Sequence, residues 1–163
     1  MANMSVNTFS PSDVKLILGG YTVVGWDNLT TARTQQSFMT IRGIRGKHTR
    51  VPSDDTSCTI TLTLIQTSPS NDVLSSIHGL DVENGTGRLE ILLKDLSGRS
   101  VFSTNEGYIV GYPEVTFSAG IEYRTWTMFC QRSSWYVGGN SKPETSLVDS
   151  ILGGLASSAG NIF

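Results

Sequence analysis

The sequence predicts a mainly β protein, an antiparallel β-sandwich or barrel with one short flanking helix and a C-terminal helix. Along residues 56–67 apolar residues alternate with threonines, and this period of two is typical of a strand with one buried face. Several other β-prone runs are separated by short turns rich in glycine, asparagine and serine. No internal repeat is visible, which argues against a propeller or solenoid.

The length of 163 residues fits one domain. We expect residues 1–163 to form that domain, with residues 1–12 as an N-terminal arm and residues 140–163 as a C-terminal extension. In the extension, Pro143 opens an apolar pattern with the 3.6-residue period of a helix. The residues on its apolar face are Leu147, Val148, Ile151, Leu152 and Leu155.

The first expected element is a hairpin. Residues 14–18 and 21–26 are β-prone and flank Gly19 and Gly20, which are able to take the positive φ values of a tight primed turn. The polar residues 27–36 are expected to form a loop, and residues 37–42 return to strand character.

The clearest strand and the helix come next. On the strand, one face carries Cys58, Ile60, Leu62 and Leu64, and the other carries Thr59, Thr61 and Thr63. Residues 68–71 offer cap and first-turn residues for a helix over residues 70–78. Gly79 is the expected stop of that helix.

The remaining chain predicts a meander. Strand patterns cover residues 88–94, 100–103, 108–112, 114–118 and 121–132. Turns are expected at residues 95–98, 105–107 and 119–120. Neither face of the last strand is cleanly polar, so we expect it to be covered on both sides for part of its length.

Composition favours assembly with other protein. Charged residues make up 16% of the chain, against roughly 25% in a typical soluble domain. A formal net charge of −2 gives no overall basic character that would attract nucleic acid. The start of the chain lacks the features of a secretory signal, and no apolar run approaches the ~20 residues of a membrane-spanning helix.

A search for catalytic or metal-binding residues finds none that the pattern supports. His78 falls in the last turn of the expected helix, where the helix dipole explains a histidine. Cys58 and Cys130 have no nearby ligand partner in the sequence, and we interpret them as small buried hydrophobes. We therefore expect no enzyme activity, no metal and no cofactor.

One charged feature is prominent. Arg42, Arg45, Lys47 and Arg50 lie in a single expected loop with no acid among them, and Asp54 and Asp55 follow. Such a loop is compatible with contact to nucleic acid, with a solvated surface, or with docking on an acidic surface of a neighbouring copy. The absence of interleaved aromatic residues gives single-strand stacking little support.

The order of these elements resembles a known family. A hairpin at residues 13–21 follows a short polar arm, a long basic loop at residues 41–55 enters the threonine-rich strand, and a helix at residues 70–78 precedes a meander. Over about residues 6–137 this order is similar to that of the tail tube proteins of contractile-tailed bacteriophages.

The resemblance implies a structural subunit without catalytic residues, located in the virion tail after synthesis in the host cytoplasm. Six subunits would form a ring, and stacked rings would form a hollow conduit for DNA delivery. The long loop would reach an adjacent subunit or ring. The implied partners are other copies of the chain, the tail sheath, baseplate and terminator proteins, and double-stranded DNA in transit without specific binding.

A tube wall that passes DNA should be rich in hydroxyls or acids and should avoid clustered cations. The face with Thr59, Thr61 and Thr63 is therefore a candidate for the lumen, while an ordinary solvent-facing sheet surface is the alternative interpretation. Two other functions stay open. One is another tail or baseplate protein with the tube fold, and the other is a β-sandwich module that binds a ligand through Trp126, Trp135 and Tyr136.

Overall fold

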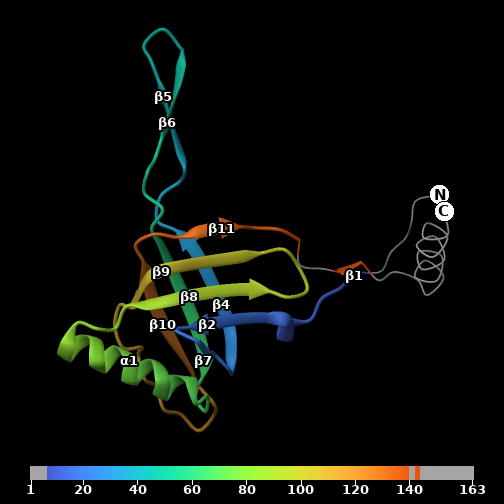
Figure 1. Cartoon of the computed structure of the whole chain (residues 1–163), viewed down its shortest axis with the longest axis vertical. Helices are drawn as coiled ribbons and strands as arrows, with labels where there is room; N and C mark the ends of the chain where they lie inside the picture. The colour runs from blue at the N-terminus through green and yellow to red at the C-terminus, as the bar shows by residue number, and fades with distance from the viewer. Residues whose placement is uncertain (1–6, 140–141, 144–163) are drawn as a thin grey trace, which may run out of the picture.

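The computed structural model describes residues 7–139 and 142–143. Figure 1 shows a β body with one helix along its lower edge and one hairpin that projects far from it. The helical elements are a short 3-10 turn (Pro11–Asp13) and α1 (Ser70–Asn84). The strands are β1 (Asn7–Thr8), β2 (Val14–Leu18), β3 (Tyr21–Thr22), β4 (Trp26–Arg33), β5 (Phe38–Arg42), β6 (His48–Pro52), β7 (Cys58–Ile65), β8 (Leu89–Asp95), β9 (Val101–Ile109), β10 (Tyr123–Cys130), β11 (Ser134–Tyr136) and β12 (Lys142–Pro143).

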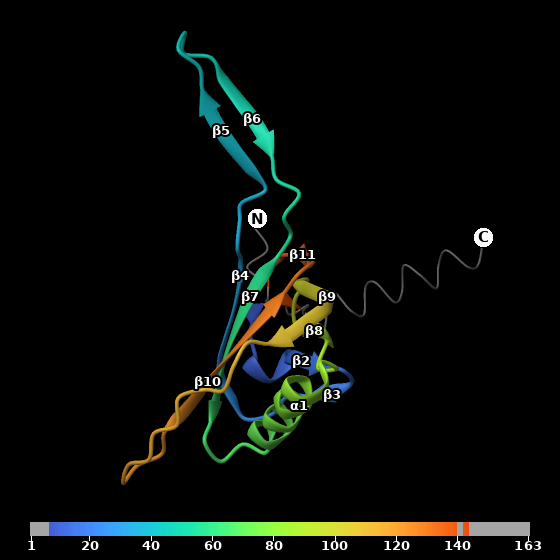
Figure 2. The same ribbon diagram turned by 90° about the vertical axis from the view of Figure 1, so that its left-hand side faces the viewer.

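The body is one antiparallel sheet of eight strands that folds over on itself. Its order is β3-β2-β8-β9-β10-β7-β4, and β11 pairs with β9 off this path. The fold-over lies at β9, since its end at Gly107–Ile109 pairs with β10 while its start pairs with β11. The half made of β2, β8 and β9 therefore crosses the half made of β10, β7 and β4 (Figure 2). The mainly β, antiparallel fold with one helix that the sequence predicted is confirmed.

The core fills the space between the two halves. On β7, burial alternates strictly, as the sequence pattern predicted, and the four apolar side chains of Cys58, Ile60, Leu62 and Leu64 have no exposed surface. Burying each such side chain contributes about 1.5–3 kcal/mol to folding, which fixes the register of this strand. Other core residues come from both halves: Leu16, Leu18, Ile91, Phe102, Ile109, Trp126, Met128 and Cys130.

Helix α1 is tied to the sheet at its first turn. The Asn71 side chain accepts a hydrogen bond from the Trp126 indole at 3.0 Å and donates to the carbonyl oxygens of Ile65 and Ser68 at 3.0 and 3.2 Å. Leu74, one turn further along, is fully buried in the core. These contacts hold the helix across the end of the sandwich.

The expected end of the helix at Gly79 is wrong. Gly79 lies inside α1, and the helix ends at Gly85, whose φ of 67° is the left-handed conformation that glycine adopts most readily. His78 is therefore a buried mid-helix residue that packs edge-on against Tyr112, with ring centroids 4.6 Å apart. His78 is not in the last turn of α1, so the helix dipole does not explain its position.

The loop expected at residues 27–36 is also wrong, because β4 pairs with β7 over most of that stretch. Half of the side chains of an edge strand face solvent, so its sequence reads as polar although its backbone is fully strand-like. The expected turn at residues 105–107 is instead the interior of β9. Gly107 is needed there, since a Cβ atom would lie 2.5 Å from the Ile91 side chain.

The hairpin expected at residues 14–26 and the strand expected at residues 114–118 have different outcomes. The hairpin at Gly19 and Gly20 is confirmed, with φ values of 55° and 89°. Residues 114–118, expected to be a strand, form none in the isolated chain. The predicted C-terminal helix lies outside the described residues. The single-domain organisation, the arm and the extension stay predictions.

Candidate assembly interface

The basic segment predicted as a loop is part of a β-hairpin. The strand expected at residues 37–42 is confirmed as β5, and β6 lies within the expected loop at residues 41–55. β5 and β6 pair with each other and with no other described strand, and every residue of both strands is exposed. A five-residue connection closes the tip, where the Gly43 amide donates to the Lys47 carbonyl at 2.8 Å. The Ser53 amide closes the base by donating to the Ser37 carbonyl at 2.8 Å. Both views of the ribbon show this hairpin standing clear of the body (Figures 1 and 2).

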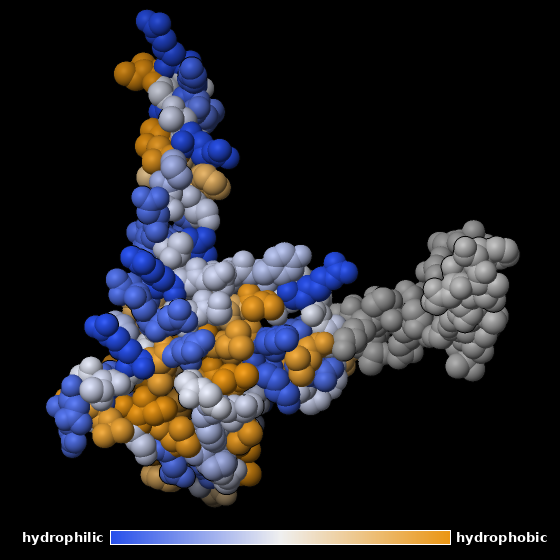
Figure 3. Space-filling view, viewed as in Figure 1, coloured by the Kyte–Doolittle hydropathy of each residue, from blue (hydrophilic) through white to orange (hydrophobic). Residues whose placement is uncertain are grey.

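The hairpin has two chemically different faces. Residues directly opposite in an antiparallel pair share a face, and the register pairs Met39 with Val51 and Ile41 with Thr49. That face is apolar, and apolar side chains are visible along the projecting hairpin in Figure 3. We call it the apolar hairpin face, consisting of Met39, Ile41 and Val51. Met39 and Ile41 alternate with Phe38 and Thr40 along β5, and this alternation signals the apolar face in the sequence, although the predicted role of the segment rested on its charges alone.

The opposite face of the hairpin is basic. Arg42 lies opposite His48, and Arg50 lies opposite Thr40, with its guanidinium 4.4 Å from the centre of the Phe38 ring. Arg45 and Lys47 are in the tip connection. Within residues 7–139 and 142–143, none of the four cations forms an ion pair. Their charges are therefore available to a partner.

The two predicted acids at the base of the hairpin differ in their surroundings. Asp54 is exposed. The Asp55 carboxylate accepts a hydrogen bond from the Ser57 amide at 2.9 Å, and its carbonyl accepts one from Arg33 at 2.9 Å. The hydrogen bond from the Ser57 backbone is the main reason that the pKa of Asp55 is lowered. Asp55 thus helps to hold the base of the hairpin against the body.

The three predicted lumen threonines are part of a wider surface, which we call the threonine face. It is the outer face of β4, β7 and β10, opposite the core. Three rows of paired residues cross it: Asn28–Thr63–Thr125, Thr30–Thr61–Thr127 and Ala32–Thr59–Phe129. None of these nine side chains carries a charge. The period of two in the strand at residues 121–132 puts Thr125 and Thr127 on one face, but only the register between β10 and β7 aligns them with Thr63 and Thr61.

Cys58 and Cys130 are direct partners across β7 and β10, and both are free and buried. Burial, followed by the neighbouring Cys58 thiol, raises the pKa of Cys130 to about 12, and burial raises the pKa of Cys58 as well. Thiols are nucleophilic only when ionised, so this environment keeps both unreactive near neutral pH. In the described part of the chain, no group of three His, Cys, Asp or Glu side chains is placed to hold a metal ion.

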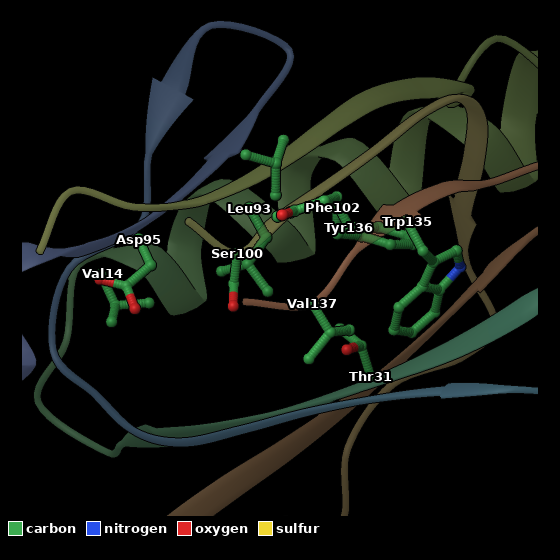
Figure 4. Close-up of a pocket in the computed structure, with 10 residues that line it drawn as sticks. Val14, Thr31, Leu93, Asp95, Ser100, Phe102, Trp135, Tyr136 and Val137 are labelled. Atoms are coloured by element: carbon green, nitrogen blue, oxygen red, sulfur yellow. The ribbon is translucent and has the colours of Figure 1, made fainter. Parts of the chain in front are cut away.

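The aromatic residues considered for a ligand-binding module do not share a surface. Trp126 is buried in the core, whereas Trp135 and Tyr136 line a shallow pocket between β9, β11 and β4. Figure 4 shows this pocket with Val14 and Asp95 at one end and Trp135 at the other. Its one carboxylate, Asp95, already accepts hydrogen bonds from the amide and hydroxyl of Ser97 at 3.1 and 2.9 Å. Among the other polar groups of the pocket, the Ser100 hydroxyl donates to the Gly138 carbonyl at 3.1 Å, and the hydroxyls of Thr31 and Tyr136 also line the wall.

Comparison with known proteins identifies the family. No protein-family model matches the chain. The chain is 30% identical over 156 residues to structural protein ORF10 of Pseudomonas phage KPP10, a match that covers 89% of this chain and 90% of that protein. The chain belongs to the family of this phage structural protein.

Solved structures of other proteins show which known fold this chain has. The cap that terminates the tube of the anti-feeding prophage matches with a TM-score of 0.58 at 15% identity, over 84% of this chain and 99% of the cap chain. The tail of an empty gene transfer agent particle with C6 symmetry matches with a TM-score of 0.58 at 11% identity, over 80% and 100% of the two chains.

A third structure is the sheath–tube complex of an extracellular contractile injection system. It matches with a TM-score of 0.52 at 13% identity, over 80% of this chain and 92% of the other. This chain therefore has the fold found in the tubes of contractile injection systems and in their terminators. The family resemblance drawn from the sequence is confirmed. Its described part contains no helix long and apolar enough to cross a membrane.

Proposed function

We propose that this chain is the tube subunit of a phage tail, and that copies of it form rings which stack into a hollow conduit for DNA. Six subunits a ring is the number that the family resemblance implies, and the likeness to a tail with C6 symmetry supports it. The observation that carries the proposal is the isolated, two-faced hairpin β5–β6. A hairpin of two strands has marginal stability alone, and this one also leaves its apolar residues in solvent.

A second copy of the chain is a suitable partner for both faces of the hairpin. The apolar hairpin face would be removed from water, which contributes about 25 cal/mol for each Å² buried. The four cations would meet a surface of opposite charge, because the chain outside residues 42–50 has 8 basic and 14 acidic residues, a net of −6. Exposed acids on the body include Asp27, Asp72, Glu83 and Glu90.

The threonine face would form the wall of the conduit. Clustered cations would bind phosphates and retard the DNA, whereas uncharged hydroxyls hydrate well and release no counterions. DNA would pass this wall without specific binding. The same sheet is therefore suited to two roles, since one face is the core of the subunit and the other is the lumen.

The proposed role needs no catalysis, cofactor or metal, and it places the protein in the virion tail after synthesis in the host cytoplasm. The other partners would be the tail sheath, the baseplate and the terminator. The likeness to a sheath–tube complex and to a tube-terminating cap supports the sheath and the terminator as partners.

A hairpin-shortened variant tests the proposal. Replacing residues 38–52 with a two-residue Asn-Gly turn joins Ser37 to Ser53, whose backbones are already hydrogen-bonded. We expect the variant to keep the circular dichroism spectrum and melting temperature of the wild-type body and to form no tubes in negative-stain images. Wild-type protein that stays monomeric at every concentration, with and without other tail proteins, would contradict the tube role.

A tube terminator is the second candidate function, because the match to the anti-feeding prophage cap is as close as the match to the gene transfer agent tail. The two roles differ in their assemblies. A tube subunit gives open cylinders of variable length, while a terminator gives single rings that bind only at the end of a tube formed by another protein. Images of the purified protein at high concentration separate them.

A further inference from the structure

The segment between β9 and β10 is extended, exposed and unpaired. Val115 and Phe117 keep 54% and 78% of their surface exposed. None of the backbone amides of residues 111–119 donates a hydrogen bond to another described residue. Figure 2 shows the segment leaving the body at the end opposite the β5–β6 hairpin. The sequence nevertheless has the β-propensity that predicted a strand at residues 114–118.

The segment already runs back along the first half of β10. A bend at Ala119 and Gly120 reverses the chain, and the Arg124 guanidinium lies 5.9 Å from the centre of the Phe117 ring. The edge of β10 that the segment approaches is incomplete. β9 pairs only with residues 128–130, so residues 123–126 pair with β7 alone.

A second incomplete edge lies at the other end of the same half-sheet. β4 pairs only with β7. Because the Thr34 amide bonds to the Ser57 carbonyl and backbone groups alternate in direction, those of Leu29, Thr31 and Arg33 point away from β7. No described strand pairs with these outward backbone groups of β4. A long unpaired edge of this kind is a template for pairing with another chain.

Ring symmetry determines how these edges are able to meet. β4 and β10 are both antiparallel to β7, so they run parallel to each other. Rotation about a ring axis preserves strand direction relative to that axis. Direct contact between β10 and the next subunit's β4 would thus be parallel, although every other pair in the sheet is antiparallel. A strand that folds back along β10 runs in the opposite direction and would be antiparallel to both.

We propose that residues 113–118 become a β-strand on assembly, inserted between β10 of their own subunit and β4 of the adjacent copy. This inference rests on the ring assembly proposed above. The strand closes the sheets β4–β7–β10 of successive subunits into one continuous wall. Pro113 would be its first residue, a position where the missing amide of proline is tolerated.

Side-chain alternation agrees with this placement. A two-residue turn at Ala119 and Gly120 would set Thr116 opposite Tyr123 and Glu114 opposite Thr125, which extends the threonine face with polar groups. Val115 and Phe117 would then lie on the other side of the sheet, where Arg124 already contacts Phe117. The polar residues face the lumen and the apolar residues face protein.

Hydrogen exchange of the wild-type full chain tests the inference. In the monomer the amides of residues 114–118 should exchange at close to the rate of an unfolded peptide. In assembled tubes they should be protected on the order of 100-fold, together with the outward amides of Leu29, Thr31 and Arg33. Tubes whose residues 114–118 still exchange freely overturn the inference and leave the proposed function intact. Protein that forms no assembly overturns both.

A pair of substitutions at Thr116 adds a second readout. Thr116→Pro removes a backbone amide that a strand with two neighbours requires, while Thr116→Ala removes the same side chain and keeps the amide. We expect the melting temperatures of both monomers to match the wild type, because the segment has no backbone hydrogen bonds to lose. Thr116→Pro should raise the concentration needed for assembly about tenfold or more. Equal assembly of both variants would refute the inserted strand.

Discussion

Met39 and Val51 are direct partners across the β5–β6 hairpin, and both are exposed, with 61% and 37% of their surface in solvent. An apolar pair on a projecting ribbon makes no contribution to the core of its own subunit. Its place in the proposed tube is against another copy, where removing each side chain from water contributes on the order of 1–2 kcal/mol.

The double variant Met39→Ser with Val51→Ser tests the apolar hairpin face. The hairpin would keep its backbone pairing but lose its apolar surface, so the critical concentration for tube formation should rise at least about tenfold. The monomer should melt within about 2 °C of the wild type, since surface substitutions change stability little. Sedimentation and negative-stain imaging measure the assembly.

Val82→Ser is the matched control for that double variant. Val82 lies on α1 and is also exposed, at 71%. Its substitution removes the same kind of side chain from a different surface. If Val82→Ser impairs tubes as much as the hairpin variant does, the effect comes from general surface polarity and the hairpin has no special role.

Charge reversal on the basic face separates docking from DNA binding. Arg45→Glu with Arg50→Glu should suppress ring stacking and leave the monomer folded, because acidic surfaces of a neighbour would then repel the hairpin. Added salt should weaken wild-type stacking, since ions screen exposed pairs beyond ~10 Å at 0.1 M. Normal tubes from the double reversal, together with wild-type protein that binds DNA at physiological salt, would assign the hairpin to nucleic acid.

Asn71 and Trp126 test the link between the helix and the core. Asn71→Ala leaves the indole N–H of Trp126 without its acceptor in a buried site, while the carbonyl oxygens of Ile65 and Ser68 keep their backbone hydrogen bonds from the Ser68 and Asn71 amides. We expect a loss of about 1–3 kcal/mol in the free energy of unfolding of the monomer, measured with urea. Ser76→Ala on the exposed side of the same helix should change it by less than ~0.5 kcal/mol. A loss at Ser76 equal to that at Asn71 would contradict the assigned link.

The cysteine pair predicts how stability depends on alkaline pH. The pKa of Cys130 is raised in the folded state from 9.0 to about 12, so folded thiols stay protonated while unfolded ones ionise. The contribution of the protonated thiols to the free energy of unfolding is fully present below pH 9. It is lost as pH rises toward 12, by up to about 1.4 kcal/mol per pH unit for each thiol. Cys130→Ala should lower stability at neutral pH and make this alkaline decline shallower. An unchanged slope in urea unfolding from pH 8 to 11 would refute the assignment.

The sequence predicted those elements whose own side chains indicate which positions are buried, exposed or in a turn. β7 has one apolar and one hydroxyl face, and only a strand satisfies both, so its limits were correct to within two residues. Gly19 and Gly20 carry the turn chemistry of a hairpin in two residues. In such places local propensity and burial agree, and the pattern is sufficient.

The errors arose where a distant partner decides the structure. β4 reads as a polar loop because it is an edge strand, and only its pairing with β7 makes it a strand. β5 was predicted from the strand character of residues 37–42, but β6 was taken for a loop. Every residue of β6 is exposed, so no alternation of burial marks it as a strand. The threonine face was predicted in part, since aligning Thr125 with Thr63 requires the register between β10 and β7.

The threonine face makes the sharpest prediction about function. Thr61 is at its centre, between Thr30 and Thr127. Thr61→Lys leaves the core untouched and should still form tubes, but each ring would place a band of cations on the wall. DNA present during assembly should then be retained in the tubes, and the retention should fall steeply with salt, as phosphate binding does. Wild-type tubes should retain none.

Two controls complete this experiment. Thr61→Gln keeps a neutral polar wall and should behave as the wild type, while Val82→Lys adds the same charge on α1, away from the threonine face. DNA held inside tubes by Thr61→Lys is resistant to nuclease, whereas DNA bound by Val82→Lys on the outside is digested. If Thr61→Lys tubes hold DNA only in a nuclease-sensitive form, the threonine face lies on the outer surface and another face lines the conduit.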